Sequence, residues 1–445
     1  MSSGETNSFE HGERIAVIGG GISGNLVARL LDSRHEVHVF EANDYVGGHT
    51  NTVDVEAFGG LFSVDTGFMV FNERTYPNFC RMLQMLDVAS QNSDMSFSVH
   101  CRRSGLEYQG SSLNGLFAQR SNLFRPSFYR MLRDVFRFNR NSVAILESAD
   151  SNLTLGEYLA KNEYSGEFID HYLIPMAAAI WSARPNELLD FPAHFLIGFF
   201  RNHGLLQIRD RPQWKTITGG ARSYVRALIE PFQNRIRLNC PIESVTRHED
   251  QVVVKPRNEP MEVFDQVVFA SHADETLAML ADADDTEREI LGAFPYQQNE
   301  AVLHTDCSLL PRRRRAWASW NYHVSKQVDL PVAVTYDLSR LQNFDSPSPI
   351  LLTLNHSDQI DASKVLRRFN YSHPAYGCDS INAQKRHAEI SGQRRTHFCG
   401  AYWGYGFHED GVNSALAVAK HFGIGLEACT VASTKDKLST TAAVQ

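Results

Sequence analysis

The first fifty residues show the apolar spacing of a strand, a helix and a second strand. Arg14–Ile18 is a short, mostly apolar run, and Glu36–Phe40 alternates polar and apolar residues with β-branched side chains. Between them, residues 23–32 repeat apolar side chains at helical spacing after a run of glycines. This order predicts a strand, a glycine-rich turn, a helix and a second strand.

The pattern changes further along the chain. Residues 76–164 are predicted to be mostly helical, and the clearest helices cover 77–86 and 126–146, each with a proline near its start. Residues 165–215 are unusually aromatic. Short strands are predicted at 236–238, 244–246, 251–255 and 266–270, after a Thr-Gly-Gly turn and a helix ending near 228, and a late glycine-rich loop precedes a helix at 412–422.

Length and composition indicate a globular protein of two domains. The chain has 445 residues, too many for one hydrophobic core, with 43% hydrophobic and 21% charged residues. The formal charge of −8 argues against a nucleic-acid partner, because phosphate binding requires a basic surface. The seven cysteines are scattered without a Cys-x-x-Cys pair, which argues against disulfides or a metal site and favours a reducing compartment.

The apolar content of the chain bears on its location. Residues 1–13 are polar, without the apolar core of a signal peptide. The most apolar stretches, 174–181 and 195–200, are far shorter than a membrane span. We therefore expect a cytoplasmic protein, with peripheral contact to a membrane left open. Residues 1–13 and 429–445 are expected to be flexible tails, and the sequence leaves the oligomeric state open.

The strongest local signal is a G-x-G-x-x-G motif at residues 19–24, between the first strand and the first helix. Gly19 permits the tight turn, Gly21 lets a pyrophosphate approach the backbone, and Gly24 allows the helix to pack closely on the strand. The helix N-terminus, at Ile22 and Ser23, presents unpaired N–H groups to phosphates. The motif in this context predicts a dinucleotide site.

An acidic residue follows at the distance that such a site requires. Glu41 ends the second strand, 17 residues after Gly24. A carboxylate there can accept hydrogen bonds from both ribose hydroxyls of an adenosine, and it would repel a 2′-phosphate. NADP is therefore disfavoured, whereas NAD and FAD both fit.

Three further segments favour FAD over NAD. They are Gly47-Gly48-His49-Thr50, the strand end that contains Gly67, and the glycine-rich residues 399–415. They resemble segments of the monoamine oxidase, phytoene desaturase and protoporphyrinogen oxidase superfamily, which carries a Gly-Gly-Arg, an Asp-x-Gly strand and a returning C-terminal segment around the flavin. His49 stands where these flavoproteins usually have arginine, and it is a weaker, titratable contact.

The resemblance implies an α/β, two-domain, FAD-dependent amine-oxidase-like fold, with a Rossmann-type FAD domain and a mixed α+β substrate domain. The FAD domain is expected to comprise residues 14–75, 216–290 and 396–428, and the substrate domain 76–215 and 291–395. The last helix is expected to point its N-terminal N–H groups, near Val412, at the flavin, with the Gly411 backbone close to the isoalloxazine. The expected FAD contacts are Gly19, Gly21, Ile22, Ser23, Gly24, Glu41, Ala42, Gly47, Gly48, His49, Thr50, Gly67, Val245, Gly400, Asp410, Gly411 and Val412, and no metal ligands are expected.

A closer resemblance bears on the substrate. Residues 175–184, 202–206, 211–214 and 406–411 are similar to bacterial "predicted NAD/FAD-binding" proteins often found beside cyclopropane-fatty-acyl synthases. The implied reaction is hydride transfer from a substrate C–H to flavin N5, desaturating a modified fatty acyl or other lipid-like substrate. The alternatives are an amine oxidase, an FAD-dependent double-bond isomerase of unsaturated fatty acids, and a flavin- or lipid-binding partner protein without turnover.

The sequence offers candidates, not a definite catalytic group. His408, Tyr402 and Trp403 lie in the expected flavin-closing loop, whereas His203, His304 and His323 are more often structural in such positions. The aromatic residues that could line a substrate tunnel, or simply pack in a core, are Trp181, Phe191, Trp214, Trp320, Tyr402 and Trp403. The arginine run 312–315 and the amphipathic helix 126–146 could meet lipid head groups or be ordinary surface.

Overall fold

The computed structural model describes residues 12–147, 153–207, 210–324 and 333–430. A five-stranded parallel sheet has the order β10-β2-β1-β14-β20. Its strands are β1 (Arg14–Ile18), β2 (Glu36–Phe40), β10 (Ile236–Arg237), β14 (Gln266–Phe269) and β20 (Thr396–Phe398). The sheet therefore combines strands from all three stretches predicted for the FAD domain, although the domain boundaries themselves stay a prediction.

Helices cover one face of this sheet and a small antiparallel sheet covers the other. The apolar residues of α1 (Ile22–Leu31), α9 (Arg222–Ile229) and α15 (His408–His421) pack on Val17, Val39 and Val268. On the opposite face Ala16, Val267 and Phe269 pack under β11 (Ile242–Arg247), β12 (Val252–Pro256) and β13 (Glu262–Phe264), together with α10 (Ala273–Met279) and α11 (Asp285–Gly292). Both faces are thus buried, as a parallel sheet requires.

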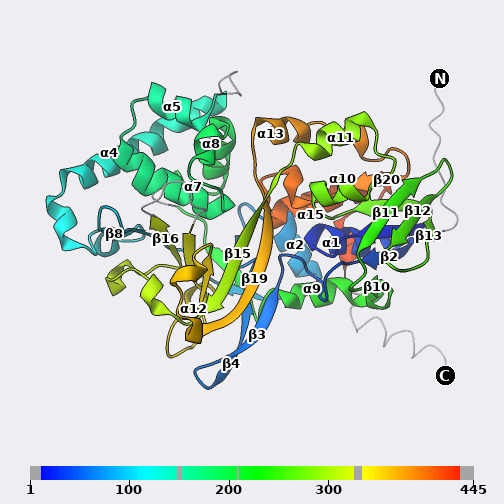
Figure 1. Ribbon diagram of the computed structural model, residues 1–445, viewed down its shortest axis with the longest axis horizontal. Coiled ribbons are helices and arrows are strands. Elements are labelled where there is room, and N and C mark those ends of the chain that lie inside the picture. The colour runs from blue at the N-terminus through cyan, green and yellow to red at the C-terminus, as the bar shows by residue number, and fades with distance from the viewer. Residues whose placement is uncertain (1–11, 148–152, 208–209, 325–332, 431–445) are drawn as a thin grey trace, which may run out of the picture.

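A seven-stranded sheet lies beside the parallel sheet, and helices cap it at the other end of the molecule (Figure 1). Its order is β19 (Val365–Pro374), β15 (Tyr296–His304), β18 (Leu351–Leu354), β17 (Ala333–Asp337), β16 (Trp320–Val324), β7 (Phe97–Cys101) and β8 (Leu106–Gln109). The β16–β7 pair is parallel and every other neighbouring pair is antiparallel.

The mostly helical prediction for residues 76–164 was wrong over the segment that forms β6 (Ser90–Asn92), β7 and β8. Phe97, Val99 and Cys101 alternate with Ser98 and His100 along β7, a strand signal of only five residues that the helical prediction overlooked. The polar side is also covered, because Ser98 is fully buried and donates to Asn321 Oδ1, more than 200 residues away, at 2.8 Å.

The predicted helices were found, with shifted ends. They are α2 (Pro77–Met85) and α4 (Pro126–Asn141), and a 3₁₀ turn over Ser142–Glu147 replaces the last part of the predicted helix 126–146. The last helix begins at His408, four residues before the predicted 412.

The remaining helices and strands are α3 (Leu113–Leu116), α5 (Leu155–Lys161), α6 (Gly166–Phe168), α7 (Ile174–Trp181), α8 (Ala193–Asn202), α12 (Leu338–Leu341), α13 (Cys378–Gln384), α14 (His387–Ile390), β3 (Thr52–Ala57), β4 (Gly60–Asp65), β5 (Phe71–Asn72) and β9 (Trp214–Ile217).

The predicted tails fall mainly on residues 1–11 and 431–445, which lie outside the described part of the chain. The inner end of the second tail was predicted wrongly, because Cys429 is fully buried and its carbonyl accepts a hydrogen bond from Arg29 at 3.2 Å. Within the described ranges, no helix has the length and apolar character to cross a bilayer.

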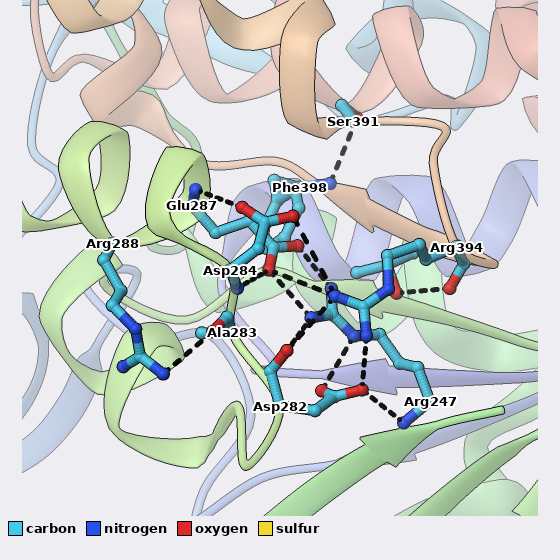
Figure 2. A network of polar contacts seen from close by, with 10 residues as sticks. Arg247, Asp282, Ala283, Asp284, Glu287, Arg288, Ser391, Arg394 and Phe398 are labelled. Carbon is cyan, nitrogen blue, oxygen red and sulfur yellow. Dashed lines mark hydrogen bonds and ion pairs between the residues drawn. The ribbon is translucent and has the colours of Figure 1, made fainter.

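An ion-pair network joins β11, the segment after α10, α11 and the segment before β20 (Figure 2). The Arg247 guanidinium pairs with Glu287 through both terminal nitrogens and with Asp282 at 3.0 Å. Arg394 donates to the same Asp282 at 2.7 Å. The side chains of Arg247 and Glu287 are almost fully buried. Since Arg247 of β11 and Arg394, two residues before β20, share Asp282, the network links the antiparallel layer to the start of β20.

We predict that Arg247→Ala destabilises the fold by about 3 kcal/mol, because buried Glu287 loses both hydrogen bonds from the Arg247 guanidinium and keeps, among the described residues, only the cation of Arg394, 3.8 Å away. Lys255→Ala is the control, since Lys255 pairs with Glu243 at 3.1 Å where both side chains are well exposed, and its loss should cost about 1 kcal/mol or less. Denaturant unfolding of the flavin-free proteins measures both free energies. Equal losses in the two variants would contradict the structural role of the network.

Candidate functional site

A cavity of about 1410 Å³ runs from the carboxyl ends of β1 and β2 to one face of the seven-stranded sheet. At the first end it is lined by the glycine-rich turn after β1 and by Glu41. At the second end it is lined mainly by aromatic and aliphatic side chains, among them Trp320, Tyr336 and Leu352. One elongated cavity therefore joins a dinucleotide-like turn to an apolar chamber.

The glycine-rich turn places an open helix N-terminus at the first end. Gly21, Ile22 and Ser23 line the cavity, and α1 begins there without a side-chain cap among the described residues. A Cβ built on Gly24 would lie 1.9 Å from the Gly19 carbonyl oxygen, so Gly24 serves helix–strand packing and lies behind the cavity wall. The unpaired N–H groups of the first turn make this end suited to phosphate.

Glu41 is held rigidly next to this turn. It is 5% exposed, its Oε2 accepts from Gly20 N at 2.7 Å, and its Oε1 accepts from Asn43 N at 2.9 Å and Asn43 Nδ2 at 2.8 Å. Since a carboxylate has about four acceptor sites, three are taken and about one remains for a ligand. The expected pair of ribose hydrogen bonds is thereby reduced to about one. Ala42 lines the cavity beside Glu41.

The expected contacts 47–50 and Gly67 form the middle of the cavity wall. Gly47, Gly48, His49 and Gly67 line it, and a Cβ on Gly67 would lie 2.1 Å from the His49 carbonyl oxygen. Thr50 is buried behind them. The segments that contain His49 and Gly67 can therefore pack against each other at the cavity wall because Gly67 has no side chain.

His49 lies in a cluster of rings rather than beside an anion. Its ring centroid is 5.1 Å from Tyr371, 5.2 Å from His373 and 6.1 Å from His272. Burial, followed by the neighbouring His373 and His272, holds the pKa of His49 well below its ordinary value. Its Nε2 is buried without a hydrogen-bond partner among the described residues. His49 is thus neutral, with one polar atom left over for a ligand.

His408 is committed to a buried polar group. Its Nε2 lies 2.9 Å from Thr50 Oγ1 and 3.1 Å from Tyr224 OH, and its ring stacks on Phe68 at 3.5 Å between centroids. Burial lowers the pKa of His408 to about 3. The imidazole is therefore neutral at pH 7 and joins α15 to the chain at Thr50, which makes it a positioning residue and a poor proton acceptor.

The other two catalytic candidates separate in the structure. Tyr402 lines the cavity, and its hydroxyl is buried without a partner among the described residues. Trp403 packs against Phe294 and His387, outside the cavity lining. Gly400, which precedes the 3₁₀ turn Ala401–Trp403, lines the cavity.

The earlier start of α15 changes the expected flavin contacts. The unpaired backbone N–H groups at the start of α15 belong to residues 408–410. Val412 lies in the second turn, and its side chain is fully buried in the core. Gly411 approaches α1, since a Cβ there would lie 2.8 Å from Ile22 Cγ2 and 3.0 Å from Ser23 Oγ. Asp410 Oδ2 accepts from Phe407 N at 2.9 Å, and burial raises the pKa of this carboxyl to about 6.

Four further expected contacts lie outside the cavity lining, and three of them belong to α15. Val412 lies in the second turn of the helix, Gly411 approaches α1, and the Asp410 side chain caps its own helix. Val245 is fully buried in the core between β11 and the parallel sheet, and the neighbouring Ile242 and Glu243 line the cavity instead.

The second end of the cavity has an apolar floor. Phe97, Trp320, Tyr336 and Leu352 are paired across four adjacent strands, so their side chains form one row on one face of the sheet. Trp181 and Trp214 also line the chamber, whereas Phe191 packs behind Trp181. Four of the six aromatic residues proposed for a tunnel therefore lie in the cavity wall.

The remaining histidine candidates divide between the cavity and the back of the sheet. His203 lines the cavity, and burial lowers its pKa to about 4. His304 and His323 lie behind the floor, where Nε2 of each contacts a threonine hydroxyl, at 2.8 Å for Thr353 and 2.9 Å for Thr335. Within the described ranges, no cluster of histidine, cysteine or acidic side chains has the geometry of a metal site.

Comparison with known proteins identifies the fold. Residues 25–294 match the family of flavin containing amine oxidoreductases. The chain belongs to this family. An L-amino-acid oxidase of Mus musculus is 23% identical over 256 residues, which are 54% of this chain and 38% of the mouse protein. The chain therefore matches well under half the length of that relative.

Solved structures of two bacterial enzymes have the same fold. The CLA-producing fatty acid isomerase of P. acnes has a TM-score of 0.66 and 16% identity, covering 94% of this chain and all of the isomerase. Cyclohexylamine oxidase from Brevibacterium oxydans IH-35A has a TM-score of 0.66 and 17% identity, covering 93% of this chain and all of the oxidase. At such identities the likeness establishes the two-part fold and leaves the substrate open.

The flavin of this family is FAD, and the cavity fits it. The uncapped start of α1, the open space beside Gly21 and the buried Glu41 suit the adenosine diphosphate part of the cofactor. The unpartnered Nε2 of His49 and the N–H groups at the start of α15 lie along the same cavity wall toward the apolar chamber. The individual contacts between these residues and FAD stay predictions.

Sequence reasoning missed the residues around His49. Tyr371 and His373 come from β19, and His272 precedes α10. Phe369, Tyr371 and His373 alternate along the chain, a strand signal that could have placed three rings on one face. The approach of β19 to His49 is tertiary and has no local signal.

We predict that Glu41→Gln weakens FAD binding by about 10- to 100-fold, because it removes a charge-assisted hydrogen bond to the ribose. It also places the glutamine NH₂ group next to the Gly20 N–H, where two donors face each other. Titration of the flavin-free protein with FAD measures the dissociation constant. Asp44→Asn, on the exposed turn after Asn43, is the control and should bind FAD as the parent does. Unchanged affinity in Glu41→Gln would exclude Glu41 as the ribose ligand.

Gly411→Val should lower both FAD retention and thermal stability, since its added carbons would push Ile22 and Ser23 and so displace the first turn of α1. Gly166→Val is the matched control, because a Cβ there would meet open space among the described residues. Flavin content after gel filtration and the melting temperature are the measurements. A parental flavin content in Gly411→Val would show that the contact between α15 and α1 is not needed for FAD binding.

Proposed function

We propose that the protein is an FAD-dependent oxidoreductase that introduces a double bond into a long apolar substrate, such as a fatty acyl chain. A hydride would leave one carbon for the flavin, and a proton would leave the neighbouring carbon for water. FAD bound in the cavity would supply the two-electron acceptor. The observation that carries the proposal is the continuous row of Phe97, Trp320, Tyr336 and Leu352 on the chamber floor. An extended chain gains about 0.8 kcal/mol for each CH₂ that such a surface buries.

The neutral histidines of the cavity wall support an uncharged substrate. The imidazoles of His49, His203 and His408 are neutral because burial lowers their pKa values. The chamber also contains the rings of Phe199 and Tyr405, with centroids 5.4 Å apart. These side chains would position the substrate and exclude water, and the N–H groups at the start of α15 favour negative charge near them.

The finer assignment draws on resemblance as well as on geometry. The likeness to bacterial proteins found beside cyclopropane-fatty-acyl synthases favours a modified fatty acyl chain, and the fold is shared with a fatty acid isomerase. A redox-neutral shift of a double bond is therefore a variant of the same proposal. The proposed location is the cytoplasm, in keeping with the free thiols of the described residues.

Amine oxidation is the second candidate function. It is favoured by the mouse L-amino-acid oxidase, and by aromatic rings such as Phe199 and Phe407, whose centroids are 5.0 Å apart in the chamber wall. An amino-acid substrate would also need a cation for its carboxylate, and the arginines of the lining are Arg211 and Arg257. Arg257 lies at the Glu41 end, next to Pro241, whose carbonyl accepts from its backbone N–H at 2.8 Å.

We predict that anaerobic mixing with free or phospholipid-bound acyl chains bleaches the flavin absorbance, whereas primary and secondary amines leave it unchanged. Leu352→Asp should abolish the response while retaining FAD, since it places a carboxyl in the floor. Leu61→Asp, on the exposed β3–β4 hairpin, is the control. Bleaching by amines alone would establish the amine oxidase instead.

Product analysis distinguishes the remaining reactions. Loss of two hydrogens from the acyl chain supports the proposed desaturation, and an unchanged mass with a moved double bond supports the isomerase variant. Ammonia and peroxide would indicate amine oxidation. If the FAD-loaded protein binds acyl chains but its flavin is not bleached and no product forms, it is a binding protein, and the enzymatic proposal is overturned.

A further inference from the structure

An apolar and basic surface lies at the end of the molecule that carries α4 and β8, far from the parallel sheet (Figure 1). It is formed by α3, the 3₁₀ turn Arg120–Phe124 and α4. Its exposed apolar side chains are Leu113 at 77%, Leu123 at 43%, Phe124 at 87%, Tyr129 at 46% and Phe136 at 58%. We call these elements with their side chains the α3–α4 surface.

The apolar residues belong to one built surface and not to separate loops. Tyr129 OH donates to the Leu123 carbonyl at 3.0 Å, which ties the 3₁₀ turn to α4. Arg120 donates to Asn114 Oδ1 and to the Phe117 carbonyl, both at 2.7 Å, which ties the same turn to α3. The exposed side chains are therefore held in place together.

The inner face of α4 is ordinary core, and its outer face is exposed. Phe128, Met131 and Phe138 are buried, whereas Tyr129 and Phe136 are exposed. Positions 129, 133, 136 and 140 recur at three- and four-residue spacing, so two aromatic side chains and two arginines share the outer face of the helix. A helix face that mixes exposed rings with arginine is typical of a helix that lies in a membrane interface.

The charge of this region is opposite to that of the chain. Residues 102–140 contain eight arginines against two acidic residues, Glu107 and Asp134, while the whole chain has a formal charge of −8. Both acidic side chains are buried, where Glu107 pairs with Arg313 at 2.7 Å and Asp134 with Arg137 at 3.4 Å. The half-buried Glu167 and the exposed Asp170 each pair with one arginine, Arg130 and Arg103, so the region stays strongly basic.

The arginine run 312–315 adds to the same surface. The turn Arg314–Ala316 packs against α3 and β8, although it is about 200 residues away in sequence. Among the described residues, no acidic side chain pairs with Arg312, Arg314 or Arg315, and all three are exposed. The chain therefore brings a second basic segment to a surface that already carries exposed aromatic side chains.

This surface adjoins the mouth of the cavity. Tyr108, Gly110 and Ser111 line the cavity, and Ser112 caps α3 by accepting from Gly115 N at 3.0 Å. Leu113, the first residue of α3, is thus two positions from the cavity wall. An acyl chain that left a bilayer at the α3–α4 surface would therefore reach the edge of the cavity directly.

We propose that the α3–α4 surface, with residues 312–315, docks on a bilayer that contains anionic phospholipids. Phe124, Leu113 and Phe136 would enter the head-group region, and the arginines would meet the lipid phosphates. Docking itself is independent of the reaction, and its purpose, delivery of acyl chains to the cavity, rests on the proposed function. The negative charge of the rest of the chain would hold the other faces away from the same bilayer.

The test is co-sedimentation of the FAD-loaded protein with vesicles of phosphatidylcholine alone or mixed equally with phosphatidylglycerol. We expect binding to the mixed vesicles that weakens at high salt, and little binding to phosphatidylcholine. Arg314→Glu with Arg315→Glu should weaken binding by about 25-fold or more, and Leu113→Ser with Phe124→Ser by about tenfold. Arg226→Glu and Leu61→Ser, exposed on other faces, are the matched controls.

Flavin content and acyl-dependent bleaching with detergent-dispersed substrate should stay parental in all these variants, since the substituted residues lie outside the cavity lining. Absence of binding to the mixed vesicles, equal losses in the controls, or equal binding to both vesicle types would overturn the docking proposal. So would a dimer in gel filtration that the same variants dissociate, because a second copy would then cover the surface. Bleaching that fails while vesicle binding persists would instead contradict the proposed function alone.

Discussion

The close approach of α1 to its two neighbours is the constraint on which the site depends. On one side Gly24 leaves room for the Gly19 carbonyl of the preceding turn, and on the other Gly411 of α15 leaves room for Ile22 and Ser23. Any larger side chain at either glycine would move the first turn of α1, where the cavity begins. Because α15 and β20 come from the end of the chain, the dinucleotide end of the cavity is complete when the third stretch of the sheet is in place.

Burial without charge is the second principle of the site. His49, His373 and His408 lie in or beside the cavity wall with pKa values lowered by burial, so these imidazoles bring polar atoms to the cavity without formal charge. Neutral imidazoles of such low pKa are poor general bases at neutral pH. They suit a site in which a bound cofactor accepts the electrons while the protein orients the substrate and excludes water.

Much of the cofactor end could be predicted from the sequence, because its signals are local. The motif at 19–24 and Glu41 lie within one strand–helix–strand unit, and β1 and β2 were found with the predicted bounds. The start of α15 was predicted too late because His408 and Glu409 are polar, yet both are buried by contacts with distant segments: His408 meets Tyr224, and Glu409 accepts from Phe79 N at 2.9 Å. The chamber floor joins β7 to strands more than 200 residues later, so its row of side chains is a property of the sheet and not of any local pattern.

The seven-stranded sheet explains how an apolar chamber can stand in front of a polar interior. Successive residues of a strand point to opposite faces, so Tyr336 and Leu352 face the chamber while Thr335 and Thr353 point behind it. The two threonine hydroxyls lie 2.7 Å apart and connect His304 to His323, which satisfies polar atoms that could not be buried singly. A one-residue slip of β17 or β18 would turn these hydroxyls into the chamber and bury the apolar side chains in the polar layer. The hydrogen-bonded layer therefore fixes the register that keeps the floor apolar, and the shape of the substrate chamber depends on residues that never touch it.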